Sequence, residues 1–153
     1  MSVKPRRILV VDDSTVTLAR VSRALTEAGY EVVATDRVVG NGRHLSSCDL
    51  AIIDFHMSGF TGDEVVSSLR GAKSTREVPC LFYLYTTDAN ATKSFAQLGF
   101  DGCFSEKGDE AALVRQVQAA FRLIRLRELG NKIKSGAGVD PAATAAARGR
   151  NRP

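Results

Sequence analysis

The chain has 153 residues, of which 44% are hydrophobic and 25% are charged, and its formal net charge is +4. This length suits a single domain, and the apolar fraction excludes a chain that is disordered throughout. No apolar run approaches the roughly 18 residues that span a bilayer, and the three cysteines form no CxxC pair, so we expect a cytoplasmic protein without membrane contact.

Short β-rich runs alternate with helical patterns along the chain. The first run, 8–11, is continuously apolar, which is typical of a strand buried on both faces. Asp13 and Ser14 can cap the helix that follows, and Gly29 ends it. Further strands are predicted at 30–34, 50–53, 79–85 and 102–104, and further helices near Gly40 and Gly42, at 62–69, at 89–98, and from Asp109 as far as Lys134.

The alternation of five strands with five helices predicts an α/β fold. We expect no hairpin turn between successive strands, so the sheet should be parallel, with helices on both faces. In such sheets ligands bind outside the carboxyl ends of the strands. The polar residues that follow the predicted strands are therefore the candidate site: Asp12 and Asp13, Asp54, Thr86 and Thr87, and Lys107.

These residue types together point to phosphoryl chemistry. Carboxylates held close to one another repel unless a cation neutralises them, and Mg²⁺ prefers oxygen ligands of this kind. Asp54 would then be free to act as a nucleophile towards a phosphoryl group. The Lys107 ammonium and a threonine hydroxyl would hold the phosphoryl oxygens, which is largely charge neutralisation and positioning.

At these residues the sequence resembles the receiver domain of two-component response regulators. The matching features occur in the family's order: the Asp12-Asp13 pair, the segment from Asp54 to Gly62 (DFHMSGFTG), a threonine after strand four, and Lys107. The resemblance covers about residues 6–128. It implies the flavodoxin-like fold, a five-stranded parallel sheet with strand order 2-1-3-4-5.

The resemblance also implies roles for individual residues. Asp54 would be the phosphoacceptor for the phosphohistidine of a histidine kinase. Asp12, Asp13 and Asp54, with the backbone carbonyl of His56, would surround Mg²⁺. Thr86 and Lys107 would bind the phosphoryl group. Apart from the resemblance, the lone imidazole of His56 is expected to have a surface or loop role and not to bind metal. Because it stands two residues after Asp54, this side chain would influence how fast water reaches the acyl phosphate.

Several positions depart from the family pattern. Ser58 stands where the family usually has proline, a change expected to loosen one loop without touching the chemistry. Thr86 is preferred to Thr87 as the phosphate-sensing hydroxyl, because Thr87 would lie next to the carboxylate of Asp88. Lys107 comes one residue late, so either a bulge restores the reach of its amine or the lysine is out of register.

The C-terminal part differs in composition from the rest. Residues 1–120 carry a net charge of −2 and residues 121–153 a net charge of +6. We expect a receiver domain at 1–128, and at 129–153 the end of the last helix and a basic, Ala/Gly-rich disordered tail. Leu126, Leu129 and Ile133 form a second apolar stripe on that helix, which either packs on something, folds back or is disordered.

The predicted function is that of a stand-alone response regulator, which takes up a phosphoryl group and signals by contact with a downstream target protein, with a homodimer as a further option. The alternative is a receiver-like interaction module with weak or no phosphorylation. Nonspecific contact of the basic tail with nucleic acid is a third option, although no recognition helix supports specific binding. An enzyme that hydrolyses phosphate esters is disfavoured, because no second carboxylate follows two residues after Asp54.

Overall fold

The computed structural model describes residues 5–37, 47–71 and 80–134. The predicted helix near Gly40 and Gly42 and the predicted tail from residue 135 lie outside the described residues. A five-stranded parallel sheet has the order β2-β1-β3-β6-β7. Its strands are β1 (Arg7–Val11), β2 (Glu31–Thr35), β3 (Leu50–Ile53), β6 (Leu81–Tyr85) and β7 (Gly102–Phe104). Since β6 and β7 are the fourth and fifth strands of this sheet in chain order, the predicted fold and the predicted strand order 2-1-3-4-5 are confirmed.

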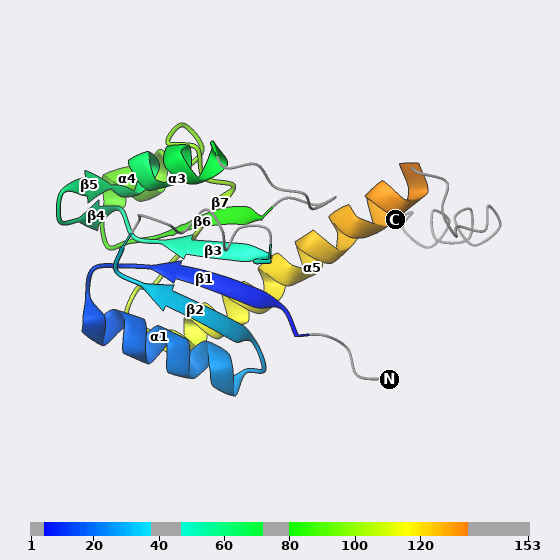
Figure 1. The fold of residues 1–153 in the computed structure, drawn as a ribbon, viewed down its shortest axis with the longest axis horizontal. Coiled ribbons are helices and arrows are strands. Elements are labelled where there is room, and N and C mark those ends of the chain that lie inside the picture. The colour runs from blue at the N-terminus through cyan, green and yellow to red at the C-terminus, as the bar shows by residue number, and fades with distance from the viewer. Residues whose placement is uncertain (1–4, 38–46, 72–79, 135–153) are drawn as a thin grey trace.

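The described helices cover both faces of the sheet (Figure 1). On one face α1 (Thr15–Glu27) and α5 (Glu110–Lys134) pack on a core that includes Ile8, Val10 and Ile52. On the other face α3 (Gly62–Arg70) packs on Leu9, Val11 and Ile53, and the short α4 (Ala89–Lys93) lies on the same side. Because alternate residues of β1 and β3 enter opposite cores, residues 8–11 of β1 and all of β3 are apolar.

Two features of the chain differ from the prediction. The α-helix expected over 89–98 ends at Lys93, because Ser94 leaves helical geometry and the chain continues in turns to Gly99, whose φ is +96°. A small hairpin that the sequence did not predict joins β4 (His56–Met57) to β5 (Phe60–Thr61) in antiparallel pairing. Gly59 turns this hairpin at φ +89°, a backbone conformation that glycine adopts without steric cost.

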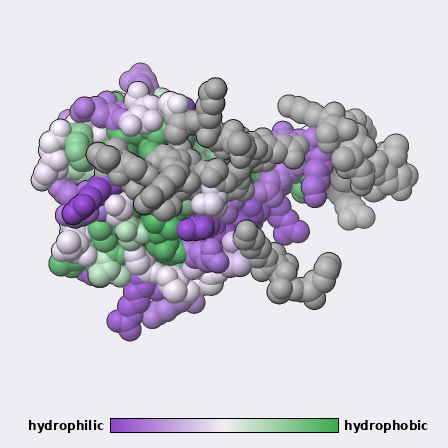
Figure 2. Space-filling view, in the orientation of Figure 1, coloured by the Kyte–Doolittle hydropathy of each residue, from purple (hydrophilic) through white to green (hydrophobic). Residues whose placement is uncertain are grey.

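Helix α5 continues well past the sheet. Arg6, which precedes β1, holds it with two hydrogen bonds to Glu128, at 2.6 and 3.1 Å. The second apolar stripe stays on a regular helix, and its side chains are exposed: Leu126 by 65%, Leu129 by 49% and Ile133 by 51%. Figure 2 shows mainly hydrophilic surface along the part of α5 that projects from the body. No helix of the described residues has the length and apolar character needed to cross a membrane.

Candidate functional site

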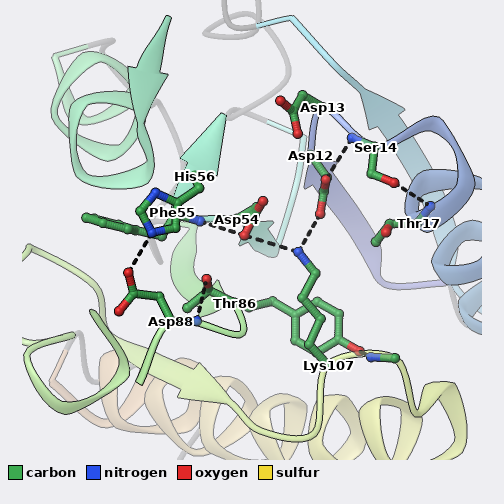
Figure 3. A network of polar contacts seen from close by, with 12 residues as sticks. Asp12, Asp13, Ser14, Thr17, Asp54, Phe55, His56, Thr86, Asp88 and Lys107 are labelled. Atoms are coloured by element: carbon green, nitrogen blue, oxygen red, sulfur yellow. Dashed lines mark hydrogen bonds and ion pairs between the residues drawn. The ribbon is translucent and has the colours of Figure 1, made fainter. Parts of the chain in front are cut away.

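Polar side chains converge at the carboxyl edge of the sheet, where β1, β3 and β6 end (Figure 3). Val11 pairs with Ile53 and Ile53 pairs with Leu84, so the residues that follow these strands emerge close together. Asp12 and Asp54 come from adjacent central strands and are almost completely buried. The buried strands therefore carry these two carboxylates to a fixed place at the edge.

Asp54 is fixed by its own backbone and by a lysine. Its N–H donates to Val11 O at 3.0 Å, and its Oδ1 accepts from Phe55 N at 2.8 Å. Burial raises the pKa of Asp54, and the positive charge of Lys107 offsets this only in part. The side chain is 11% exposed, so only a small part of it is open to solvent.

The structure leaves no room for a side chain at Gly62, eight residues after Asp54. A Cβ at this position would lie 2.5 Å from the backbone oxygen of Asp54, and its N–H already donates to Phe55 O at 2.7 Å. We expect Gly62→Ala to lower the free energy of unfolding by about 1–3 kcal/mol, because the backbone that carries Asp54 must shift. Chemical denaturation measures this loss.

Gly130→Ala is the matched control, because the residue is inside α5 and, apart from the backbone of that helix and its chain neighbours, no described atom lies within 4 Å of a Cβ there. This substitution should increase stability by about 0.5–1 kcal/mol through helix propensity. Equal effects of the two substitutions would contradict the role given to the contact between Gly62 and Asp54.

Lys107 reaches the two buried carboxylates. Its Nζ lies 2.8 Å from Asp12 Oδ2 and 3.1 Å from Asp54 Oδ1. The extra residue before it is accommodated by Glu106, which has a left-handed φ of +58°. Burial acts to lower the pKa of Lys107, but its hydrogen bonds and the charges of Asp12 and Asp54 outweigh burial and raise the pKa. The ammonium therefore stays charged between the carboxylates at neutral pH.

The raised pKa of Asp54 has a consequence for stability. A carboxyl whose pKa is higher in the folded than in the unfolded state binds more protons when folded, so its contribution to stability is present at low pH and is lost as the pH rises through the folded-state pKa. Asp54→Asn removes this dependence. At pH 7 without Mg²⁺ we expect the variant to unfold at a higher temperature than the wild type.

A thermal scan from pH 4 to pH 8 tests this expectation. The difference in melting temperature between Asp54→Asn and the wild type should grow with increasing pH. A difference that shrinks with pH would contradict the sign of the pKa shift.

Three carboxylates at this edge could hold a divalent cation. One oxygen each of Asp12, Asp13 and Asp54 lies within 4.8 Å of the others. This donor set fits Mg²⁺, which takes a few carboxylate ligands and keeps several waters. Asp13 is the exposed member, so a hydrated ion can approach from its side. The carbonyl of His56 as a fourth ligand stays a prediction.

Ser58 takes part in this cluster, contrary to the expectation that it affects only a loop. Its N–H and its hydroxyl both hydrogen bond to Asp13 Oδ2, at 2.9 and 3.2 Å. A proline would have no N–H to donate. The contact spans 45 positions of the chain, so the local pattern around Ser58 does not predict it.

The side chain of His56 points away from the carboxylates, towards the loop after β6. Its Nε2 lies 2.5 Å from Asp88 Oδ2, and Asp88 also caps α4 by accepting from Ala91 N. The hydrogen bond from Ala91 N is the main cause that lowers the pKa of Asp88, and the hydrogen bond with His56 lowers this pKa further. This contact joins the loop that follows Asp54 to the loop that carries Thr86 (Figure 3).

Thr86 and Thr87 differ in their exposure to solvent. Thr86 is buried, and its Oγ1, which accepts from Asp88 N at 3.2 Å, lies on the side of Asp54 in Figure 3. Thr87 is exposed. Thr86 as the phosphate-sensing hydroxyl stays a prediction. Tyr85 was missed by the sequence analysis: it is 2% exposed, and its hydroxyl accepts from Gly108 N at 3.2 Å.

Comparison with known proteins gives a consistent result. The family model described as "Response regulator receiver domain" matches residues 8–118. The chain is 32% identical over 124 residues to the transcriptional activator protein IrlR of Burkholderia pseudomallei. The matched region covers 80% of this chain and 53% of IrlR. The chain therefore spans about half the length of that relative.

Solved structures show the same fold at lower identity. The chemotaxis response regulator CheY4 of Vibrio cholerae superposes with a TM-score of 0.65 at 24% identity, over 76% of this chain and 98% of that one. The response regulator TrrA of Thermotoga maritima, solved in complex with Mg²⁺ and BeF, gives a TM-score of 0.61 at 23% identity, over 74% and 97% of the two chains.

Proposed function

Because the chain belongs to the response regulator receiver domain family, a family of signalling domains, we propose that it takes up a phosphoryl group on Asp54 from the phosphohistidine of a histidine kinase. The proposal assigns Mg²⁺ to Asp12, Asp13 and Asp54, with the His56 carbonyl as a further ligand. Lys107 and Thr86 would bind the phosphoryl oxygens. Support comes from the convergence of these side chains at one edge of the sheet.

The proposed step is a direct transfer. An oxygen of the Asp54 carboxylate attacks phosphorus, the bond between phosphorus and the donor nitrogen breaks, and its electron pair stays on the donor imidazole. Bound Mg²⁺ would supply charge neutralisation for the phosphoryl oxygens. The ammonium of Lys107 would bind an arriving phosphoryl oxygen in addition to Asp54. The Thr86 hydroxyl would break its hydrogen bond with Asp88 N and donate to a phosphoryl oxygen instead.

The observation that carries this proposal is the position of the Lys107 amine, 3.1 Å from Asp54 Oδ1. A lysine out of register would have favoured the alternative, a receiver-like module that signals by constitutive contact. With the amine already beside the acceptor, the phosphorylated switch is the better supported of the two functions.

Exposure of the purified chain to radiolabelled acetyl phosphate tests the proposal. We expect label on the protein in the presence of Mg²⁺ and none after chelation. Absence of label in both conditions, with partner binding unaffected by Asp54→Asn, would favour the interaction module instead.

The kinase is proposed to approach beside α1. An open cavity of about 230 Å³ lies there, lined by residues of α1, by Tyr85 and Thr87, and by the loop that carries Lys107. Val16 lines the cavity and is 66% exposed, which leaves an apolar side chain available to a partner. Lys107, which contacts Asp54, lines this cavity, so we place the donor histidine of the kinase on this side of Asp54.

Val16→Glu should therefore slow phosphotransfer from a histidine kinase that phosphorylates the wild type, by about tenfold, because it places a charge in an apolar contact. Uptake from acetyl phosphate should stay unchanged. Thr26→Glu, at the exposed far end of α1, is the matched control and should affect neither reaction. An equal loss with both donors would argue against a docking role.

For output we propose that phosphorylation changes contacts of the face formed by α4, β7 and α5 with a downstream target or with a second copy of the chain. Loss of the Thr86–Asp88 contact would release the start of α4. Action without an attached output domain, and a domain boundary at residue 128, stay predictions of the sequence.

A further inference from the structure

Tyr85 links the end of β6 to the loop that presents Lys107. It is the last residue of β6 and pairs with Phe104, the last residue of β7, so the loop after β7 begins beside it. Its hydroxyl accepts from Gly108 N at 3.2 Å, and the Lys107 Nζ lies 5.6 Å from the centre of its ring. The side chain is 2% exposed, so it is held firmly in the core.

The loop around Lys107 needs such a support. Glu106 has φ +58° and Gly108 has φ +107°, so left-handed residues stand on both sides of the lysine. Left-handed geometry is unfavourable for glutamate, and it persists only where surrounding contacts impose it. Within this loop Asp109 N donates to Glu106 O at 2.9 Å, but that bond is local and does not connect the loop to the sheet. The bond from Gly108 to Tyr85 makes this connection.

Gln116 supports only the start of the loop. Its Oε1 accepts from Ser105 N at 2.9 Å, and its Nε2 donates to Ser105 O at 3.1 Å. Both bonds lie before the left-handed residue Glu106. On the other side of Lys107, the Gly108 carbonyl accepts from Arg20 at 3.4 Å, a long contact to an exposed side chain. The hydrogen bond from Gly108 N to the hydroxyl of the buried Tyr85 is therefore the contact that fixes the backbone next to Lys107.

We propose that Tyr85 is a positioning residue, which places the Lys107 ammonium between Asp12 and Asp54 by holding Gly108 with its hydroxyl. This inference rests on the proposed function insofar as Lys107 binds the phosphoryl group. Tyr85 itself does not touch the acceptor. Its effect passes through the backbone of Gly108 to the side chain one residue earlier.

Tyr85→Phe tests the inference, because it keeps the ring and removes only the hydroxyl oxygen. We expect beryllofluoride, measured by titration at saturating Mg²⁺, to bind about three- to tenfold more weakly, since one hydrogen bond is lost. The affinity for Mg²⁺ alone should change by less than about twofold, because its three carboxylates are untouched. Tyr83→Phe is the matched control: this half-buried tyrosine lies two residues earlier on the same strand and should leave both affinities unchanged.

A double-mutant cycle separates positioning from general stabilisation. In a Lys107→Ala background, Tyr85→Phe should weaken beryllofluoride binding no further, because the side chain that it positions is gone. The same loss of affinity with and without Lys107 would overturn the inference and assign Tyr85 a purely structural role.

A measurement without any phosphoryl analogue keeps this inference distinct from the proposed function. In NMR spectra of the free protein, Tyr85→Phe should shift the Lys107 Cε resonance and speed exchange of the Gly108 amide hydrogen by at least about tenfold, and Tyr83→Phe should do neither. Unchanged Lys107 and Gly108 signals would overturn the positioning role. Failure of the wild type to bind beryllofluoride, with these signals shifted as expected, would count against the proposed function alone.

Discussion

Asp54→Asn is expected to abolish stable phosphoryl uptake from acetyl phosphate, a fall of at least about a hundredfold. A carboxamide lacks the anionic oxygen that attacks phosphorus and cannot form the acyl phosphate. Asn has nearly the same size, and the backbone bond from Asp54 N to Val11 O does not involve the side chain, so the fold should be retained. Radiolabel bound per protein, after removal of free donor, measures the loss.

Asp36→Asn is the control for this substitution. Asp36 follows β2 at the same edge of the sheet but is exposed and lies outside the carboxylate cluster, so its loss should leave labelling unchanged. Label of normal intensity on Asp54→Asn would mean that another residue accepts the phosphoryl group, and the proposed site would be wrong.

The second large effect concerns Mg²⁺. Wild-type protein should gain stability when Mg²⁺ is added, by about 2.7 kcal/mol at a concentration of one hundred times Kd. The double substitution Asp12→Asn and Asp13→Asn should remove this gain, because one of the three clustered carboxylates remains. Phosphoryl uptake at a fixed Mg²⁺ concentration should fall in parallel. Thermal unfolding with and without chelator measures the first effect.

Asp13→Asn alone is a useful companion variant. Asp12 also binds Lys107 and the N–H of Ser14, whereas within the described part of the chain Asp13 hydrogen bonds only to Ser58. The single variant should fold normally and still respond less to Mg²⁺. A Mg²⁺-dependent gain in stability that is the same in the wild type and the double variant would exclude this cluster as the metal site.

Much of the fold could be predicted because buried parallel strands have an unambiguous pattern. The run 50–53 is apolar throughout and is β3 in the structure, and 8–11 lies within β1. Predicted helix ends were less accurate where apolar spacing continues past the helix. Phe95 and Leu98 still pack on the core after α4 ends, so their spacing resembles that of a longer helix. The hairpin of β4 and β5 is too short to produce an alternating pattern.

The position of a candidate site residue was predictable where a polar residue directly follows a buried strand, as for Asp12 and Asp54. Contacts made by loops were not, since they depend on which segments the fold brings together. Ser58 meets Asp13 across 45 positions of sequence, and Tyr85 meets Gly108 across 23. The register of Lys107 depends on the left-handed Glu106, a conformation that glutamate seldom adopts and that its sequence does not signal.

Helix α5 connects the two opposite edges of the sheet. It begins close to the loop of Lys107, and Glu128, about 27 Å further along at 1.5 Å per residue, is clamped by Arg6 at the amino edge. Because α5 is held near both ends, a displacement of the Lys107 loop would be transmitted along the helix to Arg6. Under the proposed function, phosphorylation of Asp54 would then change contacts at the opposite edge of the sheet.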